Sequence, residues 1–120
     1  MKTYYLALDL KDNPVLIAEY EAWHQDVWLE IKRSIFDSGI TRMEIYRTGN
    51  RLFMVMETLD KFNFEQKAKS DRDNTRVVEW EKLMWKYQQP MPWAKEGEKW
   101  VLLERIFELN ARDFDFIKSL

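Results

Sequence analysis

Large apolar residues recur with a period of two near the start of the chain, over residues 3–10. The apolar side chains fall at every second position from Tyr4 to Leu10, which predicts a β-strand over residues 3–10. A short polar stretch then ends the alternation. In it Asn13 precedes Pro14, a typical helix start, because asparagine caps the first turn and the N–H that proline lacks has no partner there. We therefore expect a helix to begin at Pro14.

Beyond Pro14 the apolar residues recur at every third or fourth position, which is the spacing of one helix face. They are Leu16, Tyr20, Trp23, Val27, Ile31 and Ile35. Ser38-Gly39 provides a stop, since glycine tolerates the left-handed conformation that ends many helices. These signals predict one continuous helix from Pro14 to the Ser38-Gly39 stop.

The remainder of the chain predicts two strands joined by a tight turn at Gly49-Asn50, then two helices and a last strand. These elements are expected over residues 40–47, 51–58, 61–70, 75–87 and 100–109. The tail over residues 110–120 is compatible with a short helix or an extended arm. The order β, α, β, β, α, β predicts one α+β domain over residues 1–120, with a ferredoxin-like antiparallel sheet covered by helices on one face.

The strand expected over residues 51–58 is apolar on both of its alternating faces. Its two faces carry Leu52, Met54 and Met56, and Phe53 and Val55. Helices can cover only one face of the sheet, and a large uncovered apolar patch is unusual on a monomer. We therefore expect a homodimer in which two sheets pack face to face as a dimeric α/β barrel.

Composition narrows the possible partners of the chain. Lys and Arg number 19 against 21 Asp and Glu without any basic cluster, which argues against nucleic acid and against an anionic membrane as partners. The apolar stretch near the N-terminus is interrupted by charged residues too early for a membrane span or a signal-peptide core. The chain has no cysteine, which suits a reducing compartment, so we expect a cytoplasmic location.

His24 is the only histidine of the chain and has the greatest potential for chemistry. On a helix Tyr20, His24 and Trp28 follow at intervals of four residues and can reach a common point. Spacing alone leaves two interpretations open, a functional site or a packed face with a hydrogen-bonded histidine. One histidine without cysteine does not indicate a metal site, and neither a nucleophile elbow nor a phosphate-binding glycine loop occurs. Proton transfer on a neutral ligand, or binding alone, remains.

The aromatic residues around His24 suit a sugar. Aromatic rings stack on the C–H faces of sugars, and a histidine exchanges protons near neutral pH. Glu57 alternates with Phe53 and Val55, so its carboxylate lies on an apolar sheet face where it needs a partner or a role. Glu44 and Tyr46 share a face of the preceding strand. These carboxylates are also compatible with purely structural ion pairs.

An ordered set of motifs between Tyr4 and Leu109 resembles the L-rhamnose mutarotase family. The motifs are Tyr20-x-x-x-His24-x-x-x-Trp28, Ile45-Tyr46, Gly49-Asn50-Arg51-Leu52-Phe53, Glu57, Trp80 with Met84, and Ile106-Phe107-Glu108-Leu109. The resemblance implies a dimeric ferredoxin-like isomerase that interconverts the α and β pyranose anomers of a 6-deoxyhexose without a cofactor. It also implies that His24 is the proton donor and that Tyr20 and Trp80 contact the monosaccharide.

Two positions depart from the family pattern. A substrate-contacting tyrosine of the family corresponds to Met43, and an adjacent tryptophan pair corresponds to Trp80-Glu81. The Glu81 carboxylate can accept a hydrogen bond from a sugar hydroxyl, or it can act with His24 as a second acid-base group. The further substrate contacts that we expect are Met43, Trp28, Tyr46 and Glu57. L-Rhamnose and L-fucose both remain as substrates, and the alternative is a small-molecule-binding or oxygenase-type dimeric α/β barrel protein without mutarotase activity.

Overall fold

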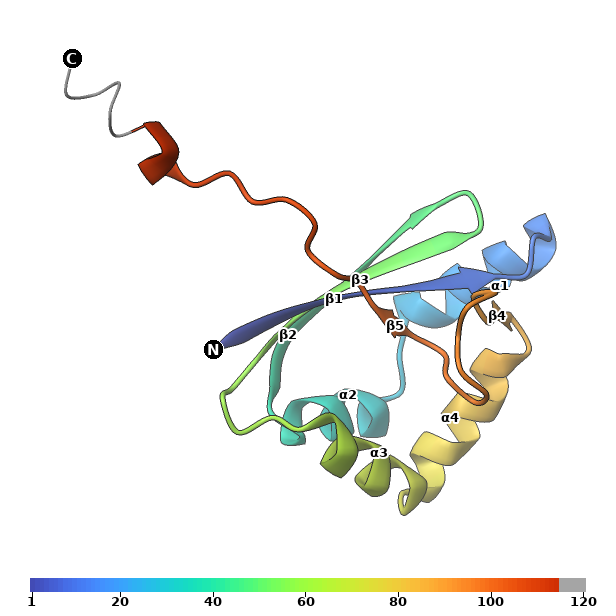
Figure 1. Ribbon diagram of the computed structural model, residues 1–120. Coiled ribbons are helices and arrows are strands. Elements are labelled where there is room, and N and C mark those ends of the chain that lie inside the picture. The colour runs from blue at the N-terminus through green and yellow to red at the C-terminus, as the bar shows by residue number, and fades with distance from the viewer. Residues whose placement is uncertain (115–120) are drawn as a thin grey trace.

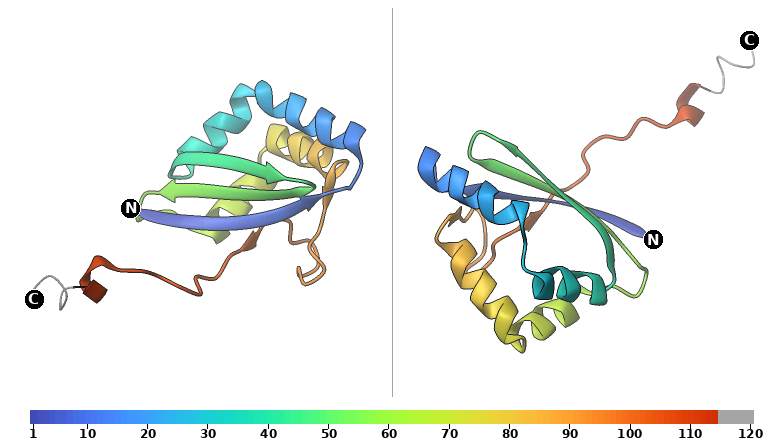
Figure 2. Two further views of the ribbon diagram at one scale, coloured as in Figure 1. Left: turned by 90° about the horizontal axis from the view of Figure 1, so that it is seen from above. Right: turned by 180° about the vertical axis from the view of Figure 1, so that it is seen from behind.

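The structure is a computed structural model that describes residues 1–114, in which four α-helices lie on one side of an antiparallel sheet (Figures 1 and 2). The strands are β1 (Lys2–Leu10), β2 (Ile40–Thr48), β3 (Arg51–Thr58), β4 (Gln88–Gln89) and β5 (Val101–Leu102). The helices are α1 (Pro14–Gln25), α2 (Leu29–Asp37), α3 (Phe64–Arg72) and α4 (Thr75–Trp85), followed by a 3-10 turn, η1 (Ala111–Phe114). None of the helices in this part of the chain is long and apolar enough to cross a lipid bilayer.

The strand order is β2-β3-β1-β4, with β5 also paired to β1. This order, with the final strand beside the first, confirms the expected α+β class and ferredoxin-like plan. The final strand is divided in two, since Gln88 pairs with Leu10 and Val101 pairs with Ala7 further along the same edge. The prediction of one strand over residues 100–109 was wrong beyond Leu102, because the chain then leaves the edge of β1 as an extended arm (Figure 1).

The single long helix predicted after Pro14 was also wrong. α1 ends at Gln25, and Trp28 has an extended backbone conformation, with φ −53° and ψ 137°, before α2 begins. Val27 and Trp28 pack against the same apolar cluster as Ile31, so the hydrophobic period continues across the break. The break lets α1 and α2 follow different parts of the sheet, as Figure 2 shows.

The two faces of the sheet have different surroundings. Leu6, Leu8 and Leu10 of β1 are buried on the inner face, which the helices cover. On the outer face the segment after β4 covers the region around Ala7. Elsewhere this face is open, and its larger side chains remain exposed, as Tyr5, Tyr46 and Phe53 are. The fold therefore leaves a partly apolar surface on the side away from the helices.

Candidate active site

A cavity of about 1210 Å³ lies between the inner face of the sheet and the helices. One group of lining residues is aromatic or polar and comes from α1, α4 and β4: Tyr20, His24, Trp80, Glu81 and Gln88. A second group is apolar and comes mainly from β2, β3 and the segment before α3: Met43, Met54, Met56, Phe62 and Phe64. The volume lies above the upper end of the usual range for small-molecule sites, about 300–1,000 Å³. The cavity is therefore large enough for a monosaccharide.

Three aromatic rings meet at the polar side of this cavity. Tyr20 and His24 are one helical turn apart on α1, and their ring centroids are 4.3 Å apart. Trp80 approaches from α4, with its ring 5.7 Å from that of His24. The imidazole therefore lies beside both Tyr20 and Trp80, the arrangement expected from the sequence.

The state of the His24 ring follows from one hydrogen bond. His24 Nδ1 is 2.9 Å from the main-chain oxygen of Tyr20. A carbonyl oxygen can only accept, so Nδ1 carries the proton, and the neutral ring keeps a lone pair on Nε2. Burial lowers the pKa of His24 below its usual value of 6.5, and the hydrogen bond to Tyr20 opposes part of this effect. At neutral pH the imidazole is therefore uncharged, with Nε2 free to accept a proton.

Tyr20 is buried, with only 3% of its surface exposed. Burial raises the pKa of its hydroxyl to about 12, the Gln88 side chain opposes that rise by hydrogen bonding, and the negative charge of Glu81 adds to it. The phenol therefore stays protonated at physiological pH. It serves as a hydrogen-bond donor rather than as a base.

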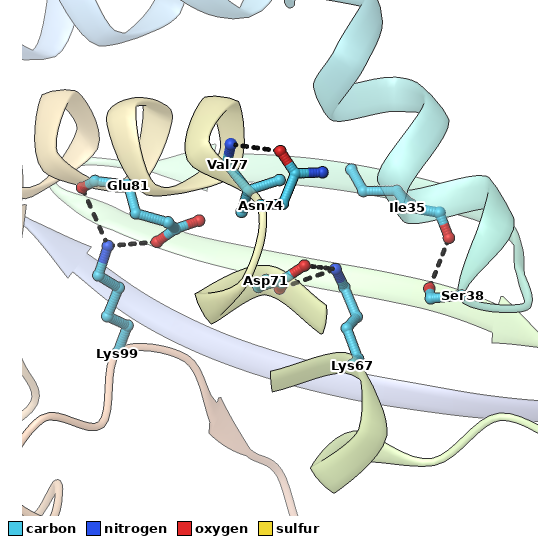
Figure 3. Close-up of polar contacts among 8 residues, drawn as sticks. All are labelled: Ile35, Ser38, Lys67, Asp71, Asn74, Val77, Glu81 and Lys99. Atoms are coloured by element: carbon cyan, nitrogen blue, oxygen red, sulfur yellow. Dashed lines mark hydrogen bonds and ion pairs between the residues drawn. The ribbon is translucent and has the colours of Figure 1, made fainter. Parts of the chain in front are cut away.

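Glu81 is held by an ion pair with Lys99, which reaches it from the segment before β5 (Figure 3). The Lys99 ammonium donates to the Glu81 carboxylate and also, at 3.2 Å, to the main-chain oxygen of Glu81. The Lys99 Nζ atom also lies 4.5 Å from the centre of the Trp85 ring. The Glu81 side chain lines the cavity, where its carboxylate oxygens can accept hydrogen bonds from a ligand.

Two other predicted contacts lie near the cavity in different roles. Met43 lines it directly from β2, beside Met56 of β3. Trp28 is not among the lining residues; its ring packs on that of Trp80 at 5.1 Å, and the Arg76 guanidinium covers it at 4.0 Å. Trp28 therefore packs against Trp80 and does not itself line the cavity.

Tyr46 and Glu57 lie on the outer face of the sheet, so the structure does not bring them together with His24. The Tyr46 hydroxyl donates to the Glu44 carboxylate at 2.7 Å. Glu57 lies 4.0 Å from the Arg42 guanidinium. Both side chains take part in polar contacts with neighbours on β2 and have no access to the cavity from this face.

The interpretation of the sequence missed two polar residues of the site, Gln88 and Lys99. Gln88 directly follows the segment predicted as a helix, and no periodic signal marks it. Lys99 is 18 positions from Glu81, so no local spacing relates the two. Among residues 1–114 no group of three or more His, Asp or Glu side chains is placed to hold a metal ion.

Comparison with known proteins identifies the family. A protein-family model described as L-rhamnose mutarotase matches residues 3–109. An L-fucose mutarotase from Xanthomonas campestris pv. campestris is 40% identical over 112 residues, which cover 92% of this chain and 90% of that protein. The chain belongs to the L-rhamnose mutarotase family. Membership confirms the expected enzyme class, an isomerase of the mutarotase type.

Solved structures agree with the fold of the L-rhamnose mutarotase family. An L-rhamnose mutarotase from Formosa agariphila superposes with a TM-score of 0.67 at 18% identity, over 92% of this chain and 100% of that one. Tetracenomycin F2 cyclase from Streptomyces glaucescens superposes with a TM-score of 0.52 at 15% identity, over 90% and 98% of the two chains. Because the second structure is a polyketide cyclase, the fold alone does not identify the reaction.

Proposed function

We propose that this chain interconverts the α and β pyranose anomers of a 6-deoxyhexose by acid-base ring opening and closure, without a cofactor. The state of His24 supports this activity most directly. Its ring is neutral, its Nδ1 proton is engaged with the Tyr20 carbonyl, and it lines a cavity large enough for a pyranose. A neutral imidazole can take up a proton and give it back near physiological pH.

The reaction needs one proton to leave the anomeric hydroxyl and one to reach the ring oxygen. Both oxygens are bonded to C1, so a single imidazole nitrogen can serve both. His24 Nε2 accepts the proton of the anomeric hydroxyl, the bond between C1 and the ring oxygen breaks, and the imidazolium returns the proton to that oxygen. The aldehyde then rotates about the C1–C2 bond, and the same steps in reverse close the ring on its other face.

The other lining residues hold the sugar in this mechanism. The Trp80 ring offers an apolar face for the C–H groups of a pyranose, and Tyr20 offers a hydroxyl donor beside His24. The Glu81 carboxylate accepts a hydrogen bond from a sugar hydroxyl or takes a second proton during ring opening. Met43 provides apolar surface suited to the C6 methyl group of a deoxysugar.

We favour L-fucose over L-rhamnose as the natural substrate. The two sugars share the C6 methyl group and differ in the orientation of their ring hydroxyls. The chain is 40% identical to a protein named L-fucose mutarotase. Met43 and Glu81, the two departures from the rhamnose-type pattern, both line the cavity, and there the loss of a tyrosine hydroxyl and the gain of a carboxylate change the hydrogen-bond partners offered to the sugar hydroxyls.

We also propose that the protein forms a homodimer through the outer face of its sheet. Tyr5 and Tyr46 on this face are 50% and 54% exposed. The arm after β5 carries further apolar side chains in the open, since Ile106 and Phe107 are 94% and 77% exposed. A second copy of the chain would cover both surfaces.

We also propose a cytoplasmic location, because a chain without cysteine suits a reducing compartment.

Exchange NMR on equilibrated sugar tests the function. Saturation of the α-anomer H1 signal should reduce the β-anomer signal in the presence of the enzyme, more strongly for L-fucose and L-rhamnose than for D-glucose. His24→Gln should keep the fold and lose about 10²-fold or more of this exchange, because the proton carrier is gone. Gln25→Ala, an exposed change next to it on α1, is the matched control and should stay active. Undiminished exchange with folded His24→Gln would contradict the mechanism.

A further inference from the structure

Gln88 is a buried polar residue in the wall of the cavity, and its hydrogen bonding is incomplete. Only 5% of its surface is exposed, and it is one of the lining residues. Its side-chain oxygen Oε1 is buried without a hydrogen-bond partner in the part of the chain that the structure describes. Buried acceptors of this kind are rare in native proteins, because a lost interaction with water is normally replaced by another one. The unpaired oxygen therefore calls for a functional explanation.

The main chain fixes the position of Gln88. The residue belongs to β4, where it pairs with Leu10 of the long strand β1. The preceding residue, Tyr87, donates its N–H to Met84 in the last turn of α4 at 2.9 Å. Because both the sheet and the helix end hold this segment, the main chain fixes where Gln88 stands in the wall of the cavity. A rigid element is the usual support for a ligand-binding group.

Gln88 and Tyr20 are complementary neighbours on this wall. Hydrogen bonding from the Gln88 side chain opposes the rise in the Tyr20 pKa, an effect that fits an amide NH₂ group turned towards the phenol oxygen. The carbonyl oxygen of the same amide has no hydrogen-bond partner within the described residues. The terminal torsion of a glutamine side chain has a broad energy minimum, so the amide can adjust its orientation to a ligand in the cavity that Gln88 lines. The two side chains together then offer a donor and an acceptor.

We propose that Gln88 is a sugar-binding residue whose side-chain oxygen accepts a hydrogen bond from one ring hydroxyl of the substrate, next to the Tyr20 hydroxyl. The proposal rests on the function proposed above, since it assigns a subsite for the same 6-deoxyhexose. A sugar hydroxyl both donates and accepts, which matches the pair of side chains. A buried acceptor that only the ligand can satisfy also discriminates strongly against a sugar that lacks the corresponding hydroxyl.

Deoxy sugars combined with a Gln88 variant test this assignment. Gln88→Met keeps an unbranched side chain of similar length and removes the amide. Gln89→Met is the matched control, because Gln89 is the adjacent residue of the same type and is exposed. Anomer exchange is measured for wild type and both variants with L-fucose and with its 2-, 3- and 4-deoxy analogues. Circular dichroism and thermal unfolding confirm that each variant is folded.

The expected pattern is specific to one hydroxyl. Gln88→Met should raise KM for L-fucose roughly tenfold with a smaller change in kcat, the effect of one lost hydrogen bond, and Gln89→Met should not. One deoxy analogue should be a poor substrate for wild type and should lose nothing further in Gln88→Met. Equal losses with all four sugars, or no loss with any of them, would overturn the role of Gln88 while leaving the enzyme a mutarotase. Failure of wild type to accelerate exchange with every sugar would instead overturn the proposed function, and the subsite with it.

A second measurement tests for direct contact between Gln88 and the sugar, and it does not depend on the activity of any variant. The side-chain amide signals of Gln88 and Gln89 are distinguished in ¹⁵N spectra by their loss in the respective variants. On titration of the wild-type protein with L-fucose, the Gln88 NH₂ signals should shift and the Gln89 signals should not. Gln88 signals that stay unchanged at saturating sugar would contradict a direct contact.

Discussion

His24 acts through its uncharged form in the mechanism proposed here. A histidine in water is partly protonated near pH 6.5, and only the neutral ring can accept the proton of the anomeric hydroxyl. Burial among Tyr20 and Trp80 moves the equilibrium further towards the neutral ring. The aromatic side chains therefore favour the proton-accepting form of His24, in addition to contacting the sugar.

The pH dependence of activity follows from this shift. Because burial lowers the pKa of His24, kcat/KM should be small at acid pH, rise as the ring loses its proton, and level off above an inflection below 6.5. The Tyr20 pKa of about 12 adds no loss of activity on the alkaline side below about pH 11. Initial exchange rates at low sugar concentration from pH 4.5 to 9 measure this profile, with the uncatalysed rate subtracted at each pH. A decline as pH rises through 6.5 would show that the protonated ring is the working form.

At the scale of single elements, α4 positions two of the side chains assigned to the site. Trp80 and Glu81 both lie on this helix, and Asn74 forms its N-cap by accepting hydrogen bonds from the main-chain N–H groups of Arg76 and Val77 at 3.1 and 3.3 Å. Figure 3 shows the bond to Val77 close to the Glu81–Lys99 pair. The cap therefore stabilises the element that carries the aromatic wall of the site.

Removal of this cap should destabilise the protein measurably. Asn74→Ala leaves the first N–H groups of α4 without their side-chain acceptor, which should lower the free energy of unfolding by about 1 kcal/mol. Asn74→Asp is the matched control, because its carboxylate still accepts these bonds and interacts favourably with the helix dipole. Urea unfolding followed by tryptophan fluorescence compares the three proteins. Equal midpoints for Asn74→Ala and wild type would mean that the cap contributes nothing to stability.

Local signals in the sequence predicted most elements and failed where tertiary packing decides. Asn13-Pro14 and Gly49-Asn50 identified a helix start and a hairpin correctly, because capping and turn formation involve only neighbouring residues. The break near Trp28 was not predicted, because the apolar period continues through it. The strand expected over residues 100–109 ended at Leu102, since a strand needs a neighbour and the arm has none within the described residues.

The same distinction applies to the site. Helical spacing and the family resemblance placed His24 beside Tyr20 and Trp80, as the structure does. Strand alternation grouped Glu57 with Phe53 correctly, but both faces of β3 are apolar, so alternation alone did not tell which face meets the helices. Gln88 depends on the pairing of two distant segments, which no local pattern reveals.

For the whole molecule, the outer face of the sheet is where a second copy should bind. Phe53, at the centre of β3 on this face, is 36% exposed and pairs across the strands with Tyr46. Phe53→Lys would bury a charge in a face-to-face contact, which is strongly unfavourable. Wild type should therefore sediment as a dimer of 14.7 kDa chains at micromolar concentration, and Phe53→Lys as a monomer. Val15→Lys, an equally drastic change at an exposed site on α1, should remain dimeric.

The fate of activity in the Phe53→Lys monomer separates two roles of the dimer. Phe53 and His24 lie on opposite sides of the sheet, and all the residues assigned here to the reaction line a cavity formed within one chain. If dimerisation only covers the outer face, the folded monomer should exchange anomers within about twofold of wild type. A partner that contributed about 1.4 kcal/mol to transition-state binding would instead make the monomer about tenfold slower. A folded monomer that loses most of its activity would show that the partner completes the cavity.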